Sequence, residues 1–183
     1  KLAHKMLLGK GAEITIVDAA DWRTKAAKEA RDEAYQAKRI PALRHNYDEA
    51  IIAADAWKAS LAAMGIVLDG ESEVPIAWQE LSDHGPIWCR AMIDHLIVRG
   101  RRAIVYDFKT SRNAHPRSCA KHIVSYGYNI QQAAYTSGLS RTIPEVAGRI
   151  DFVFLFAETV APYAVTPGRC DALLREHGER QWT

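Results

Sequence analysis

Two consecutive segments, residues 87–98 and 102–110, constrain the fold most, because each is apolar on both of its alternating sides. Successive side chains of a strand point to opposite faces of its sheet, so a strand that is apolar on both sides is covered on both sides. Patterns typical of helices precede and follow this pair of segments. The sequence therefore predicts an α/β fold, in which helices flank a central mixed β-sheet.

Hydrophobic periodicity and turn residues predict the order of the elements. Before the sheet we expect helices over residues 2–8, 21–38 and 44–64, with a short strand over 13–17. The expected strands are 73–79, 87–98, 102–110, 151–156 and 163–165, and helices are expected over 116–139 and 170–179. Pro75 indicates that the first of these strands lies near an edge of the sheet.

The 183 residues are predicted to form a single domain, with an N-terminal helical part over about 1–66 and a catalytic αβ core over about 67–183. Because the sequence begins with Lys1 and its first residues already have a helical pattern, we expect an N-terminal segment to be missing. No apolar run is long enough for a membrane span, so we expect a cytoplasmic protein.

Several cofactors are excluded by the motifs that the sequence lacks. Its three cysteines are far apart and none forms a Cys-x-x-Cys pair, which argues against an iron–sulfur cluster and a zinc knuckle. The glycines around Lys10 lack the rest of a phosphate-binding P-loop, so ATP use is not expected.

Basic residues are concentrated between Arg90 and Lys121, where eight arginines and lysines face only two acids. This stretch carries +6, although the whole chain carries only +2. A locally basic surface of this kind suits a phosphodiester substrate, and we expect Arg90 and Arg112 to contact DNA. A solvated charged face is the alternative explanation of the same stretch.

The tripeptide Asp107-Phe108-Lys109 places an acid and a lysine on the same side of one strand. If Gly100 begins a tight turn, position 94 pairs with position 107, so Asp94 and Asp107 should lie directly across from each other. Two carboxylates at that distance repel each other unless they share a cation.

A third acid comes from the preceding hairpin. If that hairpin turns at residues 83–84, Glu73 faces Asp94, whereas a bulge at Gly85 would shift this register by one residue. Glu71 is the alternative third acid, because it lies on the same side of the strand as Glu73.

This constellation predicts metal-assisted hydrolysis of a phosphodiester bond. Oxygen ligands from Glu73, Asp94, Asp107 and the Phe108 carbonyl suit Mg²⁺, with Mn²⁺ as a substitute. The cation would polarise the scissile phosphate, while Lys109 would orient the attacking water or stabilise the developing charge. A buried salt-bridge cluster between Lys109 and the acids is the structural alternative.

The order Glu73, Asp94 and Asp107-Phe108-Lys109 resembles the acidic core of the PD-(D/E)XK nucleases. Gln131 and Tyr135 follow in a Gln-x-x-x-Tyr arrangement similar to that of the RecB-like branch. Most of the chain resembles the nuclease domain of the exodeoxyribonuclease VIII (RecE-type) and phage exonuclease group. The class's Pro-Asp pair is absent, because Ile93 precedes Asp94.

This resemblance implies a Mg²⁺-dependent exonuclease on linear double-stranded DNA, active in recombination or phage DNA processing. It implies DNA contacts by Gln131 and Tyr135, and a role for His4 at the metal or phosphate. It further implies a ring-shaped homo-oligomer and a single-strand annealing recombinase as partner. An endonuclease or RNA-processing enzyme of the same fold, and a non-catalytic DNA-binding subunit, are the alternatives.

Overall fold

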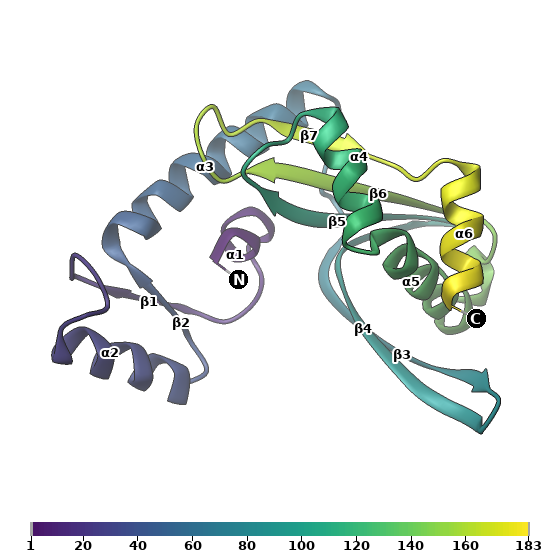
Figure 1. The fold of residues 1–183 in the computed structure, drawn as a ribbon, viewed down its shortest axis with the longest axis horizontal. Coiled ribbons are helices and arrows are strands. Elements are labelled where there is room, and N and C mark those ends of the chain that lie inside the picture. The colour runs from purple at the N-terminus through teal and green to yellow at the C-terminus, as the bar shows by residue number, and fades with distance from the viewer. Residues whose placement is uncertain (1, 183) are drawn as a thin grey trace.

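The computed structural model describes residues 2–182, and a five-stranded sheet forms its centre (Figure 1). Its strands, in spatial order, are β3 (Glu71–Ser82), β4 (Gly85–Arg99), β5 (Arg102–Ser111), β6 (Ile150–Glu158) and β7 (Val165–Gly168). The β5–β6 pair is parallel, whereas the other three pairs are antiparallel. This mixed sheet confirms the predicted fold class, and β3 lies at an edge as Pro75 indicated.

Helices cover both faces of this sheet (Figure 1). One face packs against α4 (Pro116–Ser125), α5 (Tyr128–Thr142) and α6 (Ala172–Trp182), and a short 3₁₀ helix (Pro144–Val146) follows α5. The other face packs against α1 (Leu2–Leu8) and α3 (Arg44–Ala63). Among residues 2–182, no helix combines the length and the hydropathy that a membrane span requires.

The interior strand β6 shows why both faces must be covered. Phe154 and Phe156 belong to the core beneath α4 and α5, whereas Val153 and Leu155 belong to the core beneath α3. All four side chains are at most 1% exposed. Alternate residues of one strand thus supply two separate cores, which is the arrangement predicted from strands that are apolar on both sides.

The N-terminal part contains a second, smaller sheet beside its helices. β1 (Ile14–Val17) pairs in parallel with β2 (Ile40–Leu43), and α2 (Lys25–Gln36) connects the two strands. This region was expected to be helical apart from residues 13–17, so β2 is an addition. A strand of four residues displays little period in the sequence, and β2 also contains Pro41, a residue type that strands disfavour.

Two predicted helices have different bounds in the structure. The helix expected over 21–38 begins at Lys25, because the Thr24 hydroxyl accepts a hydrogen bond from Ala27 N and caps it, whereas the Asp21 carboxylate is bound by Arg23. The helix expected over 116–139 is two helices, α4 and α5. The chain turns between them at Gly127, whose φ of 64° breaks a helix.

A close approach of α5 to β3 fixes the orientation of this helix on the sheet. A Cβ atom on Gly138 would lie 2.7–2.9 Å from the ring of Trp78, which is 4% exposed. We expect Gly138→Ala to lower the free energy of unfolding by about 1–3 kcal/mol, despite the better helix propensity of alanine. Urea denaturation measures this loss.

A double-mutant cycle provides the control. In a Trp78→Leu background the ring is gone, so the same Gly138→Ala change should be neutral or stabilising. An equal loss in both backgrounds would show that contact with Trp78 is not the cause.

Candidate active site

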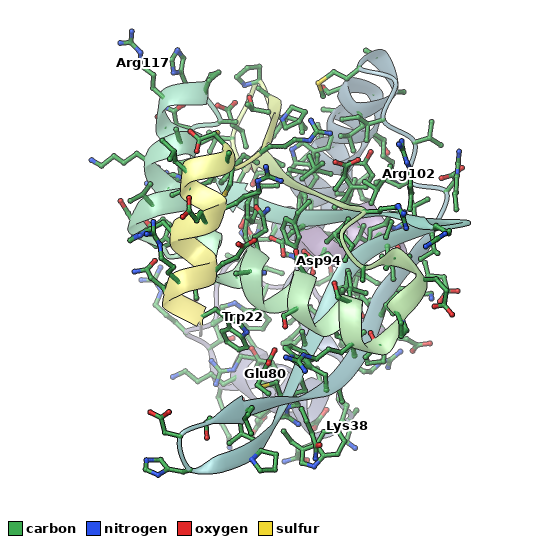
Figure 2. All side chains as sticks on the ribbon, turned by 90° about the vertical axis from the view of Figure 1, so that its right-hand side faces the viewer. Trp22, Lys38, Glu80, Asp94, Arg102 and Arg117 are labelled. Carbon is green, nitrogen blue, oxygen red and sulfur yellow. The ribbon has the colours of Figure 1, made fainter. Side chains whose placement is uncertain are left out.

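The candidate site lies where β4 and β5 separate. Their ladder has the predicted register and runs as far as the pair His95↔Tyr106. Asp94 and Asp107 come next, but the expected direct pair between them is not formed. Instead, Asp94 Oδ2 accepts a hydrogen bond of 2.8 Å from the backbone N of Phe108, which no longer has a strand partner on that side. In Figure 2 Asp94 lies near the centre of the molecule.

Asp107 is the buried charge of this site. Its side chain is 3% exposed, and burial raises the pKa of its carboxyl to about 6. Lys109 opposes this rise as the nearest positive charge, whereas the charge of Asp94 adds to it. The influence of Asp94 shows that the two carboxylates lie close enough to repel each other.

Lys109 and Gln131 hold the Asp107 carboxylate from two sides. Lys109 Nζ lies 2.5 Å from Asp107 Oδ1, and Gln131 Nε2 donates to Asp107 Oδ2 at 2.6 Å. Lys109 Nζ also donates to Gln131 Oε1 at 2.9 Å, which closes the network. A single amide side chain therefore positions both charged groups, and the structure brings these three predicted site residues together.

Two tyrosines of α5 form the wall around this network. Lys109 Nζ lies 4.5 Å from the centre of the Tyr128 ring, a distance suited to a cation–π contact. Burial, and then the charge of Asp107, raises the pKa of the Tyr135 phenol, while a hydrogen bond with Gln131 opposes the rise. Gln131 and Tyr135 are thus on the helix face that meets the site, as their spacing of four residues predicts.

His4 reaches the site from the opposite side of the sheet. Its Nε2 lies 3.3 Å from Asp94 Oδ2, and its ring meets the Phe108 ring edge to face with centroids 5.0 Å apart. Phe108 in turn packs against Trp57 of α3. The helix that carries His4 is anchored in the same core by Leu7, which is 6% exposed.

Glu73 has the predicted register but does not join the other acids. β3 and β4 pair so that Glu73 lies opposite Asp94, yet the ladder is interrupted there because Glu73 has a φ of 52°. Such a distortion re-aims a side chain, and the carboxylate lies against Gly11. The alternative acid Glu71 is exposed and pairs with Leu96.

The two arginines expected to contact DNA lie in depressions on either side of the site. Arg90 is exposed and lines a hollow together with Tyr135. Arg112 is exposed and lines a groove of about 430 Å³ together with Lys109 and Tyr128. Both cations are therefore available to a ligand that reaches the candidate site.

The donor groups around Asp107 fit a divalent cation in part. Asp107 Oδ1 is buried and has no hydrogen-bond donor in good geometry, although Lys109 lies beside it. A buried oxygen of this kind, close to the like charge of Asp94, is a natural cation ligand. Within residues 2–182, however, no three His, Cys, Asp or Glu side chains converge into a metal site. Two acids and the Phe108 carbonyl are the candidate ligands, and Glu73 would have to turn away from Gly11 to join them.

Sequence reasoning assigned no role to Gly11. With a φ of 100°, Gly11 adopts a conformation that side chains disfavour, and a Cβ there would lie 3.0 Å from Glu73 Oε1. The signal in the sequence is the pair of glycines around Lys10, which do not form a complete P-loop.

The model of the family DUF3799, a PDDEXK-like domain of unknown function, matches residues 5–167 of the chain. A search of curated proteins finds no match. Among solved structures, the crystal structure of a candidate exonuclease from Eubacterium rectale is similar, with a TM-score of 0.57 at 10% identity over 86% of this chain. The chain spans 57% of the length of that protein, and the likeness shows the fold alone. A second structure, that of SSO0001, has a TM-score of 0.40 at 13% identity, with 99% of this chain and 82% of that chain covered.

The raised pKa of Asp107 predicts how stability depends on pH. An unfolded chain releases this proton near the ordinary value of 3.8, whereas the folded protein keeps it up to about pH 6. The free energy of unfolding should therefore fall as pH rises from 4 to 6. Asp107→Asn removes this dependence, and we expect it to stabilise the protein at pH 7 by about 1–3 kcal/mol.

Urea denaturation in EDTA across pH 4–7 measures the effect. Asp83→Asn, in the exposed turn between β3 and β4, is the matched control and should follow the unmutated protein. A loss of stability in Asp107→Asn at pH 7 would mean that the pairing with Lys109 outweighs the cost of burying the charge.

Proposed function

The chain belongs to the PDDEXK-like family DUF3799, and on that premise we propose that it is a metal-dependent deoxyribonuclease. The observation that carries this proposal is the convergence of Asp94, Asp107 and Lys109 with Gln131 at the point where β4 and β5 separate. A buried carboxylate with a raised pKa beside a second acid is expensive in a purely structural role. A salt-bridge cluster alone would not require Asp94.

Magnesium is the proposed cofactor, held by Asp94, Asp107 and the Phe108 carbonyl, with Glu73 as a further candidate ligand. When bound, the cation would polarise the scissile phosphate and lower the pKa of a water molecule. The hydrogen bond from Phe108 N keeps the Asp94 carboxylate at the gap between the strands. The protein thus orients its acidic oxygens before substrate arrives, which reduces the reorganisation needed for reaction.

Lys109 is the proposed electrophilic residue. Its ammonium is held between Asp107 Oδ1 and Gln131 Oε1. With the charge of Asp107 balanced by the proposed cation, Lys109 would be free to stabilise negative charge on the phosphate or to orient the attacking water. Gln131 is a positioning residue in this scheme, because it bonds both groups and fixes their separation.

His4 is the proposed partner of Asp94. Its Nε2 faces Asp94 Oδ2, and the contact with Phe108 fixes the plane of its ring. A group in this place can hold a proton or contact a phosphate oxygen beside the acids. Tyr135, Arg90 and Arg112 surround the site and are the proposed DNA contacts. Gln131 was also expected to contact DNA, and it stays a candidate contact although it bonds Asp107 and Lys109.

An exonuclease on linear double-stranded DNA, acting in recombination or phage DNA processing, is the finer proposal. The description of the Eubacterium rectale neighbour as a candidate exonuclease supports it, as does the resemblance of the candidate site residues to the RecE-type group. A ring-shaped homo-oligomer and a single-strand annealing recombinase are the partners proposed with it.

Digestion of matched DNA substrates tests the reaction. With Mg²⁺ we expect linear duplex DNA to be degraded and covalently closed circles to survive, while Lys109→Ala loses activity by at least about 100-fold. Lys121→Ala, a lysine of α4 outside the site, is the control and should retain activity. Cleavage of closed circles would assign an endonuclease, and cleavage of RNA in preference to DNA would assign an RNA-processing enzyme.

Metal binding tests the site without reference to activity. Titration calorimetry with Mn²⁺ should detect binding that Asp107→Ala abolishes and Asp83→Ala leaves unchanged, because Asp107 is a proposed ligand and Asp83 is not. If the unmutated protein binds no Mn²⁺ and cleaves no nucleic acid, the chain is a non-catalytic subunit instead.

A further inference from the structure

A cavity of about 880 Å³ lies between the N-terminal elements and the edge of the sheet. Its walls come from α1, the loop after α1, the end of α2, the start of β2 and Glu73 of β3. His4 lines this cavity and lies 3.3 Å from Asp94. The cavity therefore adjoins the proposed active site, and of its lining residues only His4 and Glu73 have a role in the mechanism above.

The charge of this cavity is mainly positive. Lys5, Lys10, Lys38 and Arg39 line it, whereas Glu73 is the one carboxylate in its lining. A concave surface with an excess of one charge concentrates ligands of the opposite charge.

Two of these cations are already engaged, and two are not. Lys5 Nζ donates to the carbonyls of Gly9 and Gly11, and Arg39 pairs with Glu13 at 2.7 Å. Within the described part of the chain, Lys10 and Lys38 form no ion pair, which leaves both ammonium groups available to an anion.

The backbone at Lys38 is a second, independent observation. Lys38 follows the end of α2 with a φ of 56°, and the hydrogen bonds Lys38 N→Tyr35 O and Arg39 N→Ala34 O make a Schellman motif. Glycine is the residue that suits this position, because a side chain there is strained. A lysine thus occupies a position where glycine would be more stable, and it lines the cavity. Figure 2 shows Lys38 at the lower edge of the molecule, away from Asp94 at the centre.

We propose that this cavity binds the sugar–phosphate backbone of the DNA strand on one side of the cleaved bond, with Lys10 and Lys38 as phosphate contacts. The inference rests on the proposed function, because it assigns the path of that enzyme's substrate. Lysines are point charges without a planar fork, so they suit phosphates read without regard to base sequence. They come from separate segments along the wall, which favours an extended polyanion over a single small anion.

Fluorescence anisotropy with a labelled single-stranded oligonucleotide of mixed sequence, in EDTA to prevent cleavage, tests the inference. We expect the double variant Lys10→Ala/Lys38→Ala to bind on the order of tenfold more weakly at 0.1 M salt. We also expect the plot of log affinity against log salt concentration to become less steep. The magnitude of its slope should decrease by roughly 1.4, since each of the two phosphate contacts to a single strand contributes about 0.7. The control Lys28→Ala/Lys58→Ala removes the same charge from exposed lysines outside the cavity lining.

Lys38→Gly separates a binding role from a structural one. Glycine relieves the strained backbone, so the melting temperature should rise, while affinity for the oligonucleotide should fall. A variant that is more stable and binds DNA as well as the unmutated protein would overturn the role of Lys38.

The remaining outcomes distinguish failure of the inference from failure of the proposed function. Equal weakening by the cavity variant and its control would overturn the inference, because the effect would be one of general charge. Competition by thymidine monophosphate at concentrations near those of the oligonucleotide would also overturn it, in favour of a small-anion site. In both cases Mg²⁺-dependent digestion that is lost in Asp107→Ala would leave the proposed function intact. Absence of both DNA binding and cleavage by the unmutated protein would overturn both.

Discussion

The arrangement of the site depends on one buried charge, that of Asp107 on the central strand β5. A carboxylate that is 3% exposed is tolerated only if other groups neutralise it and bond to it, and Lys109 and Gln131 do so from a neighbouring strand position and from α5. The stability of the buried Asp107 charge therefore depends on the position of α5, which carries Gln131. The turn at Gly127 and the close contact of Gly138 with Trp78 hold this helix where its glutamine reaches Asp107.

Near this charge the hydrogen-bonded pairing of the sheet is interrupted in two neighbouring ladders, β4–β5 and β3–β4. The β4–β5 ladder ends before Asp94, whose carboxylate replaces the missing strand partner of Phe108 N. On β3, Glu73 adopts a left-handed conformation directly opposite Asp94. Unpaired strand positions and strained residues persist only where the surrounding structure enforces them, and they cluster at functional sites. Both ladders are interrupted at Asp94, which ties the distortion of the sheet to the candidate site.

The sequence predicted the parts of this arrangement that follow from local periods. Strands apolar on both sides implied helices on both faces, and the position of the Gly100 turn fixed the register that leads to Asp94 and Asp107. The parts that were not predicted depend on backbone conformation at single residues. Gly127 divides one expected helix into two, and the φ of Glu73 turns its carboxylate toward Gly11. A backbone conformation at a single residue leaves no repeating pattern in the sequence. It is determined by the elements that pack around that residue, so it could not be predicted from periodicity.

Net charge along the sequence predicted the basic surface near the site, but it did not predict the basic cavity lined by Lys10 and Lys38. The reason is again that the sequence does not show which groups lie together in space. The stretch from Arg90 to Lys121 is basic in sequence, and its arginines flank the site. Residues 5–39 hold eight basic and six acidic residues, so their sum predicts little. Most of those acids are occupied by partners outside the cavity, in the pairs Arg23–Asp21, Lys25–Glu29, Arg31–Asp32 and Arg44–Asp18. A polyanion binds the cations that have no acidic partner, and the fold determines which cations these are. Within the described residues, Lys10 and Lys38 are left as unpaired cations of the cavity, because Glu13 pairs with Arg39 and most other acids of this segment pair outside the cavity. They form the surface that we propose for phosphate.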